Sequence, residues 1–386
     1  MGPHPAVAAV RSAVRRALAE YPTDRPALVA CSGGPDSMAL AAALAFVAAR
    51  TGRPAGLVTV DHGLQSGSAR QAGQVAEFGY QLGLDPVWQL RVSVGRRGGL
   101  EAAARAARYA ALESCRGEQA LVLLGHTADD QAETVLLGLG RGSGPRSIAG
   151  MRPATGGYLR PLLGLRRADT EAMCAALGLP CWQDPHNTDP RFQRSRLRAE
   201  VLPLLDDVLQ GGVVPALART AGQLQDVLDA LDLLAGTVLA SAKSTDGLDA
   251  RMLAGQPNAV VSRVVKRWAE AAGAGALSAV HVKQLSALVL RWHGQAGVDL
   301  PGGRRAVRTA GRLRLINSPE PSGANGCLLT YPGEVGTRSS QPTLAQVPGS
   351  TGAEFPTDAE FDKLRAPVDK RCGVPSQLNA SSTSRP

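Results

Sequence analysis

The chain has 386 residues, of which 44% are hydrophobic, and this is enough for two or three domains with cores of their own. Its formal net charge of +9 favours a polyanionic partner, although a basic protein without one is the alternative. Aromatic residues make up only 4%, which excludes base stacking as the main contact with a nucleic acid. The longest charge-free apolar run, 38–49, is too short to cross a bilayer, so we expect a cytoplasmic protein and no membrane partner.

The first half of the chain alternates helical patterns with short apolar runs. Near the N-terminus, Val7, Val10, Val14 and Leu18 recur at helical spacing, which predicts a helix that packs on the domain rather than a targeting segment. The predicted strands occupy 27–31, 56–60, 86–92 and 120–124. This alternation over 1–205 predicts an α/β fold, a doubly wound parallel sheet with its site at the carboxyl ends of the strands.

The most specific motif follows the first predicted strand and precedes a helical pattern that begins near Met38. It consists of Ser32, Gly33, Gly34, Pro35, Asp36 and Ser37. A glycine turn between a strand and a helix lets backbone N–H groups bind phosphate, and the helix dipole favours the anion. The sequence has no Walker motif and no loop lysine, so Asp36 indicates a bound Mg²⁺ beside the phosphates of a nucleotide. A polar turn without a ligand is the alternative.

Polar residues also follow two other predicted strands. Asp61 and His62 follow the second strand and are candidates for contacting the nucleotide, with a plain turn as the alternative. His126, Asp130 and Glu133 follow the fourth strand, and His126 could contact phosphate or cap a helix. A helix that begins here puts Asp130 and Glu133 on one face, where two carboxylates can bind Mg²⁺ or accept a proton. An acidic helix N-terminus without chemistry is the alternative.

Arginines gather in two further places. Arg105 and Arg108 share one face of a predicted helix with Tyr109 on its flank, an arrangement that could hold phosphates or stack on a base. Arg194 and Arg198 belong to a denser arginine run, which indicates contact with a polyphosphate chain. A solvated basic face in the first case and a salt-bridged helix in the second are the alternatives.

The rest of the chain divides into three parts. Residues 206–245 are rich in Leu and Ala with helical period, which predicts a helical connection. Residues 246–316 form a small second domain with two predicted helices and a hairpin around Leu300-Pro301-Gly302-Gly303. Residues 317–386 are rich in Pro, Gly, Ser and Thr without a sustained period, which predicts a disordered tail.

Together these motifs resemble the tRNA(Ile)-lysidine synthases, which belong to the PP-loop superfamily of N-type ATP pyrophosphatases. Their order and spacing match over about 25–205. One departure is Ser195, where the family usually has asparagine after the arginine. The matching segments are 32–37, 60–64, 100–105, 126–134, 141–146, 160–163 and 184–198.

The resemblance implies an adenine nucleotide alpha hydrolase-like fold and an ATP-dependent carbon–nitrogen ligase. In that family the C2 oxygen of the wobble cytidine in a CAU anticodon attacks the α-phosphate of ATP, and diphosphate leaves. The ε-amine of free lysine then attacks C2, AMP leaves, and codon specificity changes from AUG to AUA. The implied partners are isoleucine tRNA and L-lysine, the implied cofactors are ATP and Mg²⁺, and a homodimer is allowed.

The resemblance also distributes roles among the candidate residues. Asp36, Asp130 and Glu133 are expected to be catalytic, and Asp36 is expected to hold Mg²⁺. The small domain 246–316 is expected to bind tRNA. The expected ATP-binding residues are Ser32, Gly33, Gly34, Pro35, Asp36, Ser37, Asp61, His62 and His126. The expected tRNA-binding residues are Arg105, Arg108, Arg194 and Arg198.

Three other functions stay open at the level of sequence. The nearest is another PP-loop tRNA enzyme, a thiolase, although the six cysteines form no Cys-x-x-Cys pair and free thiols are the default. An amide-forming PP-loop ligase would need a glutaminase region, which the sequence lacks. A non-enzymatic RNA-binding module would not need Asp36, Asp130 and Glu133.

Overall fold

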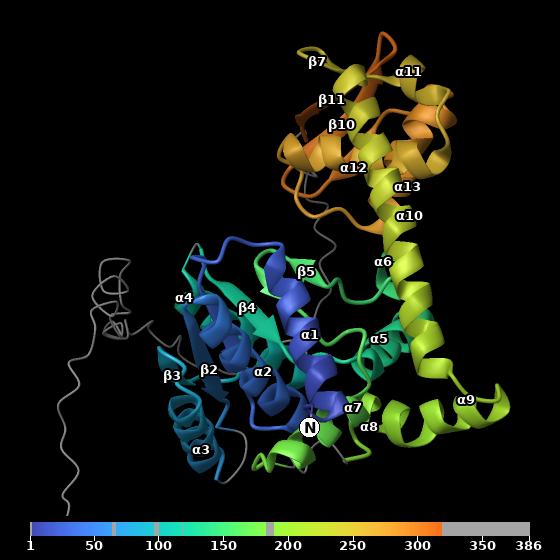
Figure 1. Ribbon diagram of the computed structural model, residues 1–386. Coiled ribbons are helices and arrows are strands. Elements are labelled where there is room, and N and C mark those ends of the chain that lie inside the picture. The colour runs from blue at the N-terminus through green and yellow to red at the C-terminus, as the bar shows by residue number, and fades with distance from the viewer. Residues whose placement is uncertain (1, 64–66, 96–99, 118, 183–188, 319–386) are drawn as a thin grey trace, which may run out of the picture.

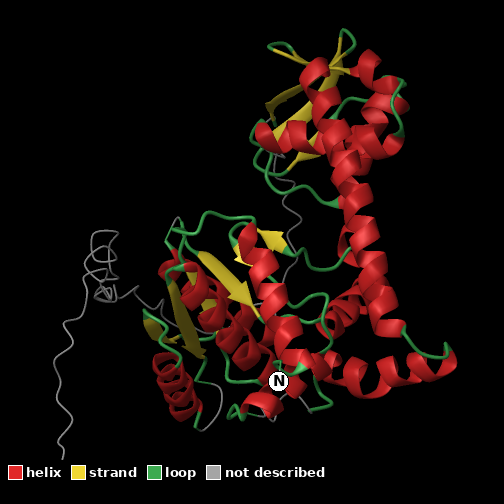
Figure 2. Ribbon diagram, viewed as in Figure 1, coloured by secondary structure: helices red, strands yellow, loops and turns green. Residues whose placement is uncertain are grey.

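The computed structural model describes residues 2–63, 67–95, 100–117, 119–182 and 189–318. Two parts of the chain, each with its own sheet, are joined by one long helix (Figures 1 and 2). The tail predicted for 317–386 falls outside the described residues except at its first two positions. Of the matching segment 184–198, residues 184–188 also lie outside them.

The first sheet has six strands in the order β3-β2-β1-β4-β6-β5. The predicted strands are present as β1 (Ala27–Ala30), β2 (Ala55–Asp61), β3 (Val87–Arg91) and β4 (Leu121–Leu124), all paired in parallel. Two strands too short for a sequence signal, β5 (Ala154–Thr155) and β6 (Tyr158–Leu159), extend the sheet, and β5 is antiparallel. The parallel α/β sheet predicted from the sequence is confirmed, with β5 as an addition.

Both faces of this sheet are covered by helices. Strand side chains alternate between the faces, so Val29 and Leu57 join a core with α1 (Pro5–Ala19), α2 (Pro35–Thr51), α3 (Ser68–Gln81) and α7 (Arg167–Leu177). Leu28 and Val58 point the other way and pack with α4 (Leu100–Arg116). Coverage of both faces explains why the strands are continuous apolar runs.

The predicted N-terminal docking helix is confirmed. Val7, Val10, Val14 and Leu18 are all buried, and α1 packs against α2 and α7. Each buried aliphatic side chain of this kind contributes about 1.5–3 kcal/mol relative to exposure, so the stripe is sufficient to fix the helix.

The connection between the two sheets is almost entirely helical. Helices α5 (Ala128–Gly140) and α6 (Pro145–Ile148) lie between β4 and β5. After β6 the described chain passes through α7, α8 (Gln193–Arg196), a π-helical turn (Leu197–Val201) and α9 (Leu202–Val208). The last helix of this part is α10 (Val213–Ala242), whose 30 residues extend for roughly 45 Å at 1.5 Å per residue. It packs on α5 at one end and on α12 (Asn258–Ala271) at the other (Figure 1).

The second sheet has five strands in the order β7-β8-β11-β10-β9, and all its pairs are antiparallel. The predicted hairpin around 300–303 is present as β9 (Val298–Leu300) and β10 (Arg304–Thr309). Apolar side chains of α12, including Val261, Val265 and Trp268, form the core beneath this sheet. The remaining elements are β7 (Lys243–Ser244), β8 (Gly247–Asp249), α11 (Ala250–Ala254), α13 (Ala279–Leu290) and β11 (Arg312–Asn317).

Among the described residues, no single helix has the length and apolar composition to cross a membrane. Only the helical stretches 193–208 and 213–242 taken together would meet that test, and they are bent by 93° relative to each other.

Candidate active site

The glycine motif forms a tight turn between β1 and α2. Gly33 has a φ of +90°, the left-handed conformation that favours glycine. A Cβ there would also lie 2.5 Å from Nε2 of Gln71, whose flexible side chain would have to move. The hydroxyl of Ser37 donates to the carbonyl of Gly34 at 2.9 Å and accepts from the N–H of Ser32 at 3.1 Å. These bonds hold the turn from within and leave the helix N-terminus without a side-chain cap.

The helix after this turn begins earlier than the sequence pattern predicts. It starts at Pro35 rather than near Met38, because proline is pre-organised for the first helical position. Asp36 therefore lies in the first turn of α2, at the positive end of the helix dipole. The carboxyl end of β4 approaches this turn closely: a Cβ on Gly125 would lie 3.1 Å from the backbone of Asp36.

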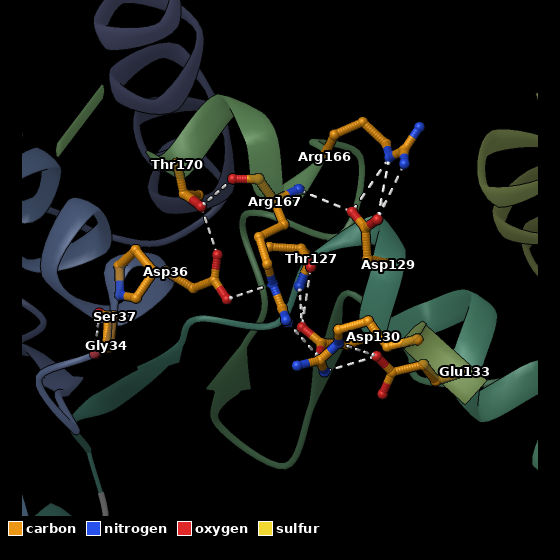
Figure 3. Close-up of polar contacts among 12 residues, drawn as sticks. Gly34, Asp36, Ser37, Thr127, Asp129, Asp130, Glu133, Arg166, Arg167 and Thr170 are labelled. Carbon is orange, nitrogen blue, oxygen red and sulfur yellow. Dashed lines mark hydrogen bonds and ion pairs between the residues drawn. The ribbon is translucent and has the colours of Figure 1, made fainter. Parts of the chain in front are cut away.

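Arg167 joins the carboxylates that follow two different strands (Figure 3). Its guanidinium contacts Asp36 at 3.3 Å and Asp130 at 3.1 Å. Thr170, one turn further along α7, donates its hydroxyl to Asp36 and also lies 2.7 Å from the carbonyl of Arg167. The sequence analysis did not identify Arg167 or Thr170, because nothing in their local pattern indicates a contact with residues more than 30 positions away.

The second half of the network lies along α5. Arg198 contacts Glu133 at 2.7 Å and Asp130 at 3.6 Å, and Arg194 contacts Glu133 at 3.4 Å. Asp130 also accepts hydrogen bonds from the backbone N–H and hydroxyl of Thr127 at 2.9 and 3.0 Å, and so caps the helix. We call Asp36, Asp130 and Glu133, with their arginines Arg167, Arg194 and Arg198, the strand-end network.

The three carboxylates differ in the direction of their pKa shifts. Burial raises the pKa of Asp36 and of Glu133 by more than the nearby Arg167 and Arg198 lower it. Burial also acts on Asp130, but Arg167 and the bond from Thr127 outweigh it, so the pKa of Asp130 is lowered. The environment therefore favours the ionised form of Asp130 and disfavours that of Asp36 and of Glu133.

His126 lies between the network and the arginines of α4. Burial lowers the pKa of His126, and the charges of Arg108, Arg160 and Arg105 lower it further against the opposing effect of Asp130. The ring is therefore neutral at neutral pH, and its Nδ1 has no hydrogen-bond partner among the described residues. A neutral imidazole with a spare nitrogen can bind either a donor or an acceptor on a ligand.

The predicted arginine pair of α4 is arranged around one aromatic ring. The guanidiniums of Arg105 and Arg108 lie 4.9 and 5.8 Å from the centroid of Tyr109, and Arg105 donates to the Tyr109 hydroxyl at 3.3 Å. Burial lowers the pKa of Arg108, and the charges of Arg105 and Arg194 lower it further. A half-buried guanidinium among other cations is suited to an anionic ligand.

Asp61 has a more structural environment. It is buried and accepts a hydrogen bond from the N–H of Gly63 at 2.9 Å. A bond from Ser68 is the main reason why the pKa of Asp61 is lowered. These contacts close the turn after β2, the alternative given for Asp61 and His62; the neighbouring residues 64–66 lie outside the described chain. A role of this turn in nucleotide binding stays a prediction.

The described residues contain no group of three His, Cys, Asp or Glu side chains placed to hold a metal ion by themselves. They do offer the half-buried carboxylate of Asp36 beside the glycine turn. Mg²⁺ commonly takes one or two protein carboxylates and completes its shell with phosphate oxygens and water. The donor set therefore fits a magnesium ion that arrives with a nucleotide.

A glycine turn at a helix N-terminus, at the carboxyl edge of a parallel sheet, is typical of nucleotide-binding α/β proteins, and a smaller second domain follows it in this chain. Family models match accordingly: the PP-loop domain over residues 8–205 and the TilS substrate binding domain over 248–314.

The similarity to curated proteins is high over most of the chain. The chain is 55% identical over 317 residues to the tRNA(Ile)-lysidine synthase of Thermobifida fusca, and the match covers 81% of this chain and 98% of that protein. It is 50% identical over 347 residues to that of Streptomyces coelicolor, covering 81% and 99%. The chain belongs to the tRNA(Ile)-lysidine synthase family, and the resemblance noted from its motifs is confirmed.

Among solved structures, the U34-tRNA thiolase NcsA from Methanococcus maripaludis aligns with a TM-score of 0.47 at 16% identity, over 57% of this chain and 80% of that chain. That likeness is too distant to bear on function.

Proposed function

We propose that this chain is an ATP-dependent ligase that joins lysine to C2 of the wobble cytidine in the CAU anticodon of isoleucine tRNA. Family membership supports the activity and the tRNA substrate. The observation that supports the chemistry is the strand-end network. In it Arg167 forms ion pairs both with Asp36, beside the glycine turn, and with Asp130 on α5. The sulfur-transfer and amide-ligase alternatives lose their support with the family assignment.

The first step forms an adenylated tRNA. The C2 oxygen of cytidine attacks the α-phosphorus of ATP, the bond to the β-phosphate oxygen breaks, and diphosphate leaves. Backbone N–H groups of Gly34 and Asp36 would hold the phosphates at the α2 N-terminus, since Pro35 has no N–H and that of Ser37 donates to the carbonyl of Gly34. Asp36 would hold Mg²⁺, which offsets charge on the phosphate oxygens when bound. His126, Arg105 and Arg108 surround the same strand ends and are proposed to bind the nucleotide and the RNA backbone.

The second step needs an unprotonated amine. Lysine has a reference pKa of about 10.4, so its ammonium must lose a proton before nitrogen attacks C2 and the C–O bond to AMP breaks. We propose that ionised Asp130 attracts the ammonium and that Glu133 accepts the proton, since a base with a raised pKa lies nearer the working pH. In this structure Arg194 and Arg198 form ion pairs with Glu133. If the phosphates of bound tRNA attracted these two arginines, the Glu133 carboxylate would become available to the lysine amine.

A direct test is transfer of radiolabelled lysine, with ATP and Mg²⁺, onto an unmodified isoleucine tRNA transcript bearing CAU. The methionine tRNA with the same anticodon is the control. We expect ATP-dependent label on the isoleucine transcript alone. AMP formation with tRNA but without label would contradict lysine as the nucleophile. Because its substrate is tRNA, we also propose a cytoplasmic location; the homodimer stays a prediction.

A further inference from the structure

One carboxylate of the connecting helix is shared by arginines from both sides of it. Asp232 in α10 accepts from Arg146 of α6, whose Nη2 lies 2.8 Å from each carboxylate oxygen. It also accepts from Nε of Arg263 in α12 at 2.9 Å and contacts Nη2 of Arg267 at 3.3 Å. Nη1 of Arg267 donates to the backbone carbonyl of Asp232 at 2.6 Å. A single side chain thus links the PP-loop domain to the second domain.

The same face of α10 is fastened to the PP-loop domain at two earlier positions. Gln225 donates to the carbonyls of Ala149 and Met151 at 2.6 and 3.0 Å. Asp229 accepts hydrogen bonds from the two terminal guanidinium nitrogens of Arg152, Nη1 and Nη2. Spacings of four and three residues place these positions and Asp232 on one side of the helix. We call Asp229 and Asp232, with Arg146, Arg152, Arg263 and Arg267, the junction network.

The anchored segment also reaches the catalytic helix. Gln131 of α5 donates to the carbonyl of Met151 at 2.9 Å and accepts from its N–H at 2.8 Å. The α5 backbone also packs tightly on α6, because a Cβ on Gly138 would lie 2.5 Å from the carbonyl of Ser147. Helix α5, which bears Asp130 and Glu133, and helix α10, which leads to the second domain, therefore both bind the short segment 149–151.

We propose that Asp232 is a positioning residue that fixes the second domain at the angle needed for tRNA to reach the strand-end network. Three guanidiniums converge on it, so its loss leaves three like charges facing one another and favours separation of α12 from α6. The ten residues of α10 beyond Asp232 extend for about 15 Å, so a bend of about ten degrees at Asp232 would shift the end of the helix by about 2–3 Å and the second domain with it. The proposal rests on the function proposed above.

The test compares Asp232→Asn with Asp229→Asn. Asp229 is a matched control because its ion pair lies within the same network but does not touch α12. For Asp232→Asn we expect the KM for tRNA to rise about tenfold, while the KM for ATP and the kcat at saturating tRNA stay within about twofold. Asp229→Asn should leave all three within about twofold. Equal tRNA KM values in the two variants would overturn the proposal.

A second measurement does not depend on activity. Fluorophores introduced through unnatural amino acids at the exposed positions Tyr80 in α3 and Val280 in α13 report the distance between the domains. We expect a broadened or shifted energy-transfer distribution in Asp232→Asn and a wild-type distribution in Asp229→Asn. An unchanged distribution in Asp232→Asn would also overturn the proposal. If the wild-type protein failed to transfer lysine, the proposed function would fail while this distance measurement still decided the role of Asp232.

Should Asp232→Asn not fold, Arg263→Gln opens the same link from the other side with the carboxylate intact. Arg263 has only 16% of its side chain exposed, so it is poorly placed to act through direct contact with RNA. We expect the same increase in tRNA KM and the same change in the energy-transfer distribution. Wild-type values for both would count against the positioning role.

Discussion

The molecule contains two arginine–carboxylate networks with different environments. In the strand-end network the Glu133 side chain has no exposed surface and that of Asp130 is 13% exposed. In the junction network Asp232 is 18% exposed and Asp229 is 53% exposed. Asp36 is 17% exposed, so Asp232 is about as enclosed as the carboxylates of the strand-end network, and only Asp229 faces water. The two networks therefore differ most between Glu133, in a low dielectric, and Asp229, in water.

The pKa directions divide the carboxylates differently. Burial dominates at Asp36 and Glu133 and raises their pKa, whereas the pKa of Asp130 in the same network is lowered. At Asp232, Arg146 and Arg263 outweigh burial, and Arg152 has the larger effect at Asp229, so the pKa of both carboxyls is lowered. The junction carboxylates stay charged and serve as mechanical links. At these carboxylates, in contrast to Asp36 and Glu133, the attraction of the arginines outweighs the cost of desolvation.

The largest expected effect separates the two networks by activity. Asp36→Ala and Asp130→Ala should each lower the rate of AMP formation with tRNA by about 100- to 1,000-fold, because each removes a charge aimed at a reacting group. Asp229→Ala, in the junction network, should change it by less than about twofold. Circular dichroism checks that all three variants fold. Near-normal turnover by both Asp36→Ala and Asp130→Ala would contradict the proposed catalytic roles of these two carboxylates.

A second prediction contrasts two neighbours within the strand-end network. Glu133 has a raised pKa, so its contribution to stability is present below its ordinary value of 4.5 and is lost as pH rises through the raised value. Asp130 has a lowered pKa, so its contribution is present above its ordinary 3.8 and is lost as pH falls through the lowered value. At pH 7, Asp130→Asn should lower the free energy of unfolding by about 2 kcal/mol.

Glu133→Gln should lower that free energy by less than Asp130→Asn does, because the neutral amide avoids the desolvation that the carboxylate suffers and so offsets the lost pairing with Arg194 and Arg198. Urea unfolding at pH 7 measures both variants, and m-values check that the unfolded states are comparable. Equal destabilisation by the two substitutions would show that charge attraction, and not burial, dominates at Glu133.

The smallest expected effect concerns Thr170. Its hydroxyl proton is shared between Asp36 and the carbonyl of Arg167, and its bond to Asp36 lowers the pKa of that carboxyl. Thr170→Val should therefore raise the pKa of Asp36 further and increase the Mg²⁺ concentration needed for half-maximal rate by about tenfold.

Lowering the pH should raise the Mg²⁺ concentration needed for half-maximal rate in both proteins. In Thr170→Val this rise should begin at a higher pH than in the wild-type protein. Thr170→Ser keeps the hydroxyl and should restore the wild-type profile. A Mg²⁺ requirement that Thr170→Val leaves unchanged would mean that Asp36 does not hold the ion.

The local elements of the fold were predictable because each has a short-range cause. The apolar runs specify β1 to β4, the Val and Leu spacing specifies α1, and Gly33 specifies the phosphate turn. The start of α2 at Pro35 also has a local signal in its proline, which the apolar pattern from Met38 onward obscures. β5 and β6 have two residues each, too few for a period to be recognised.

The sequence by itself determined the PP-loop architecture, the family and the identity of the candidate carboxylates, because motifs and periodicity act over a few residues. Only the tertiary structure decided which cation serves which carboxylate. Thr170 meets Asp36 across 134 positions, and Arg146 meets Asp232 across 86. Such pairings depend on which helices the sheet brings together, and the balance between burial and the cations and hydrogen bonds at the meeting point sets the sign of each pKa shift. Asp130 and Glu133 are both buried and lie three residues apart on one helix, yet Arg167 and Thr127 lower the pKa of Asp130 while burial prevails at Glu133.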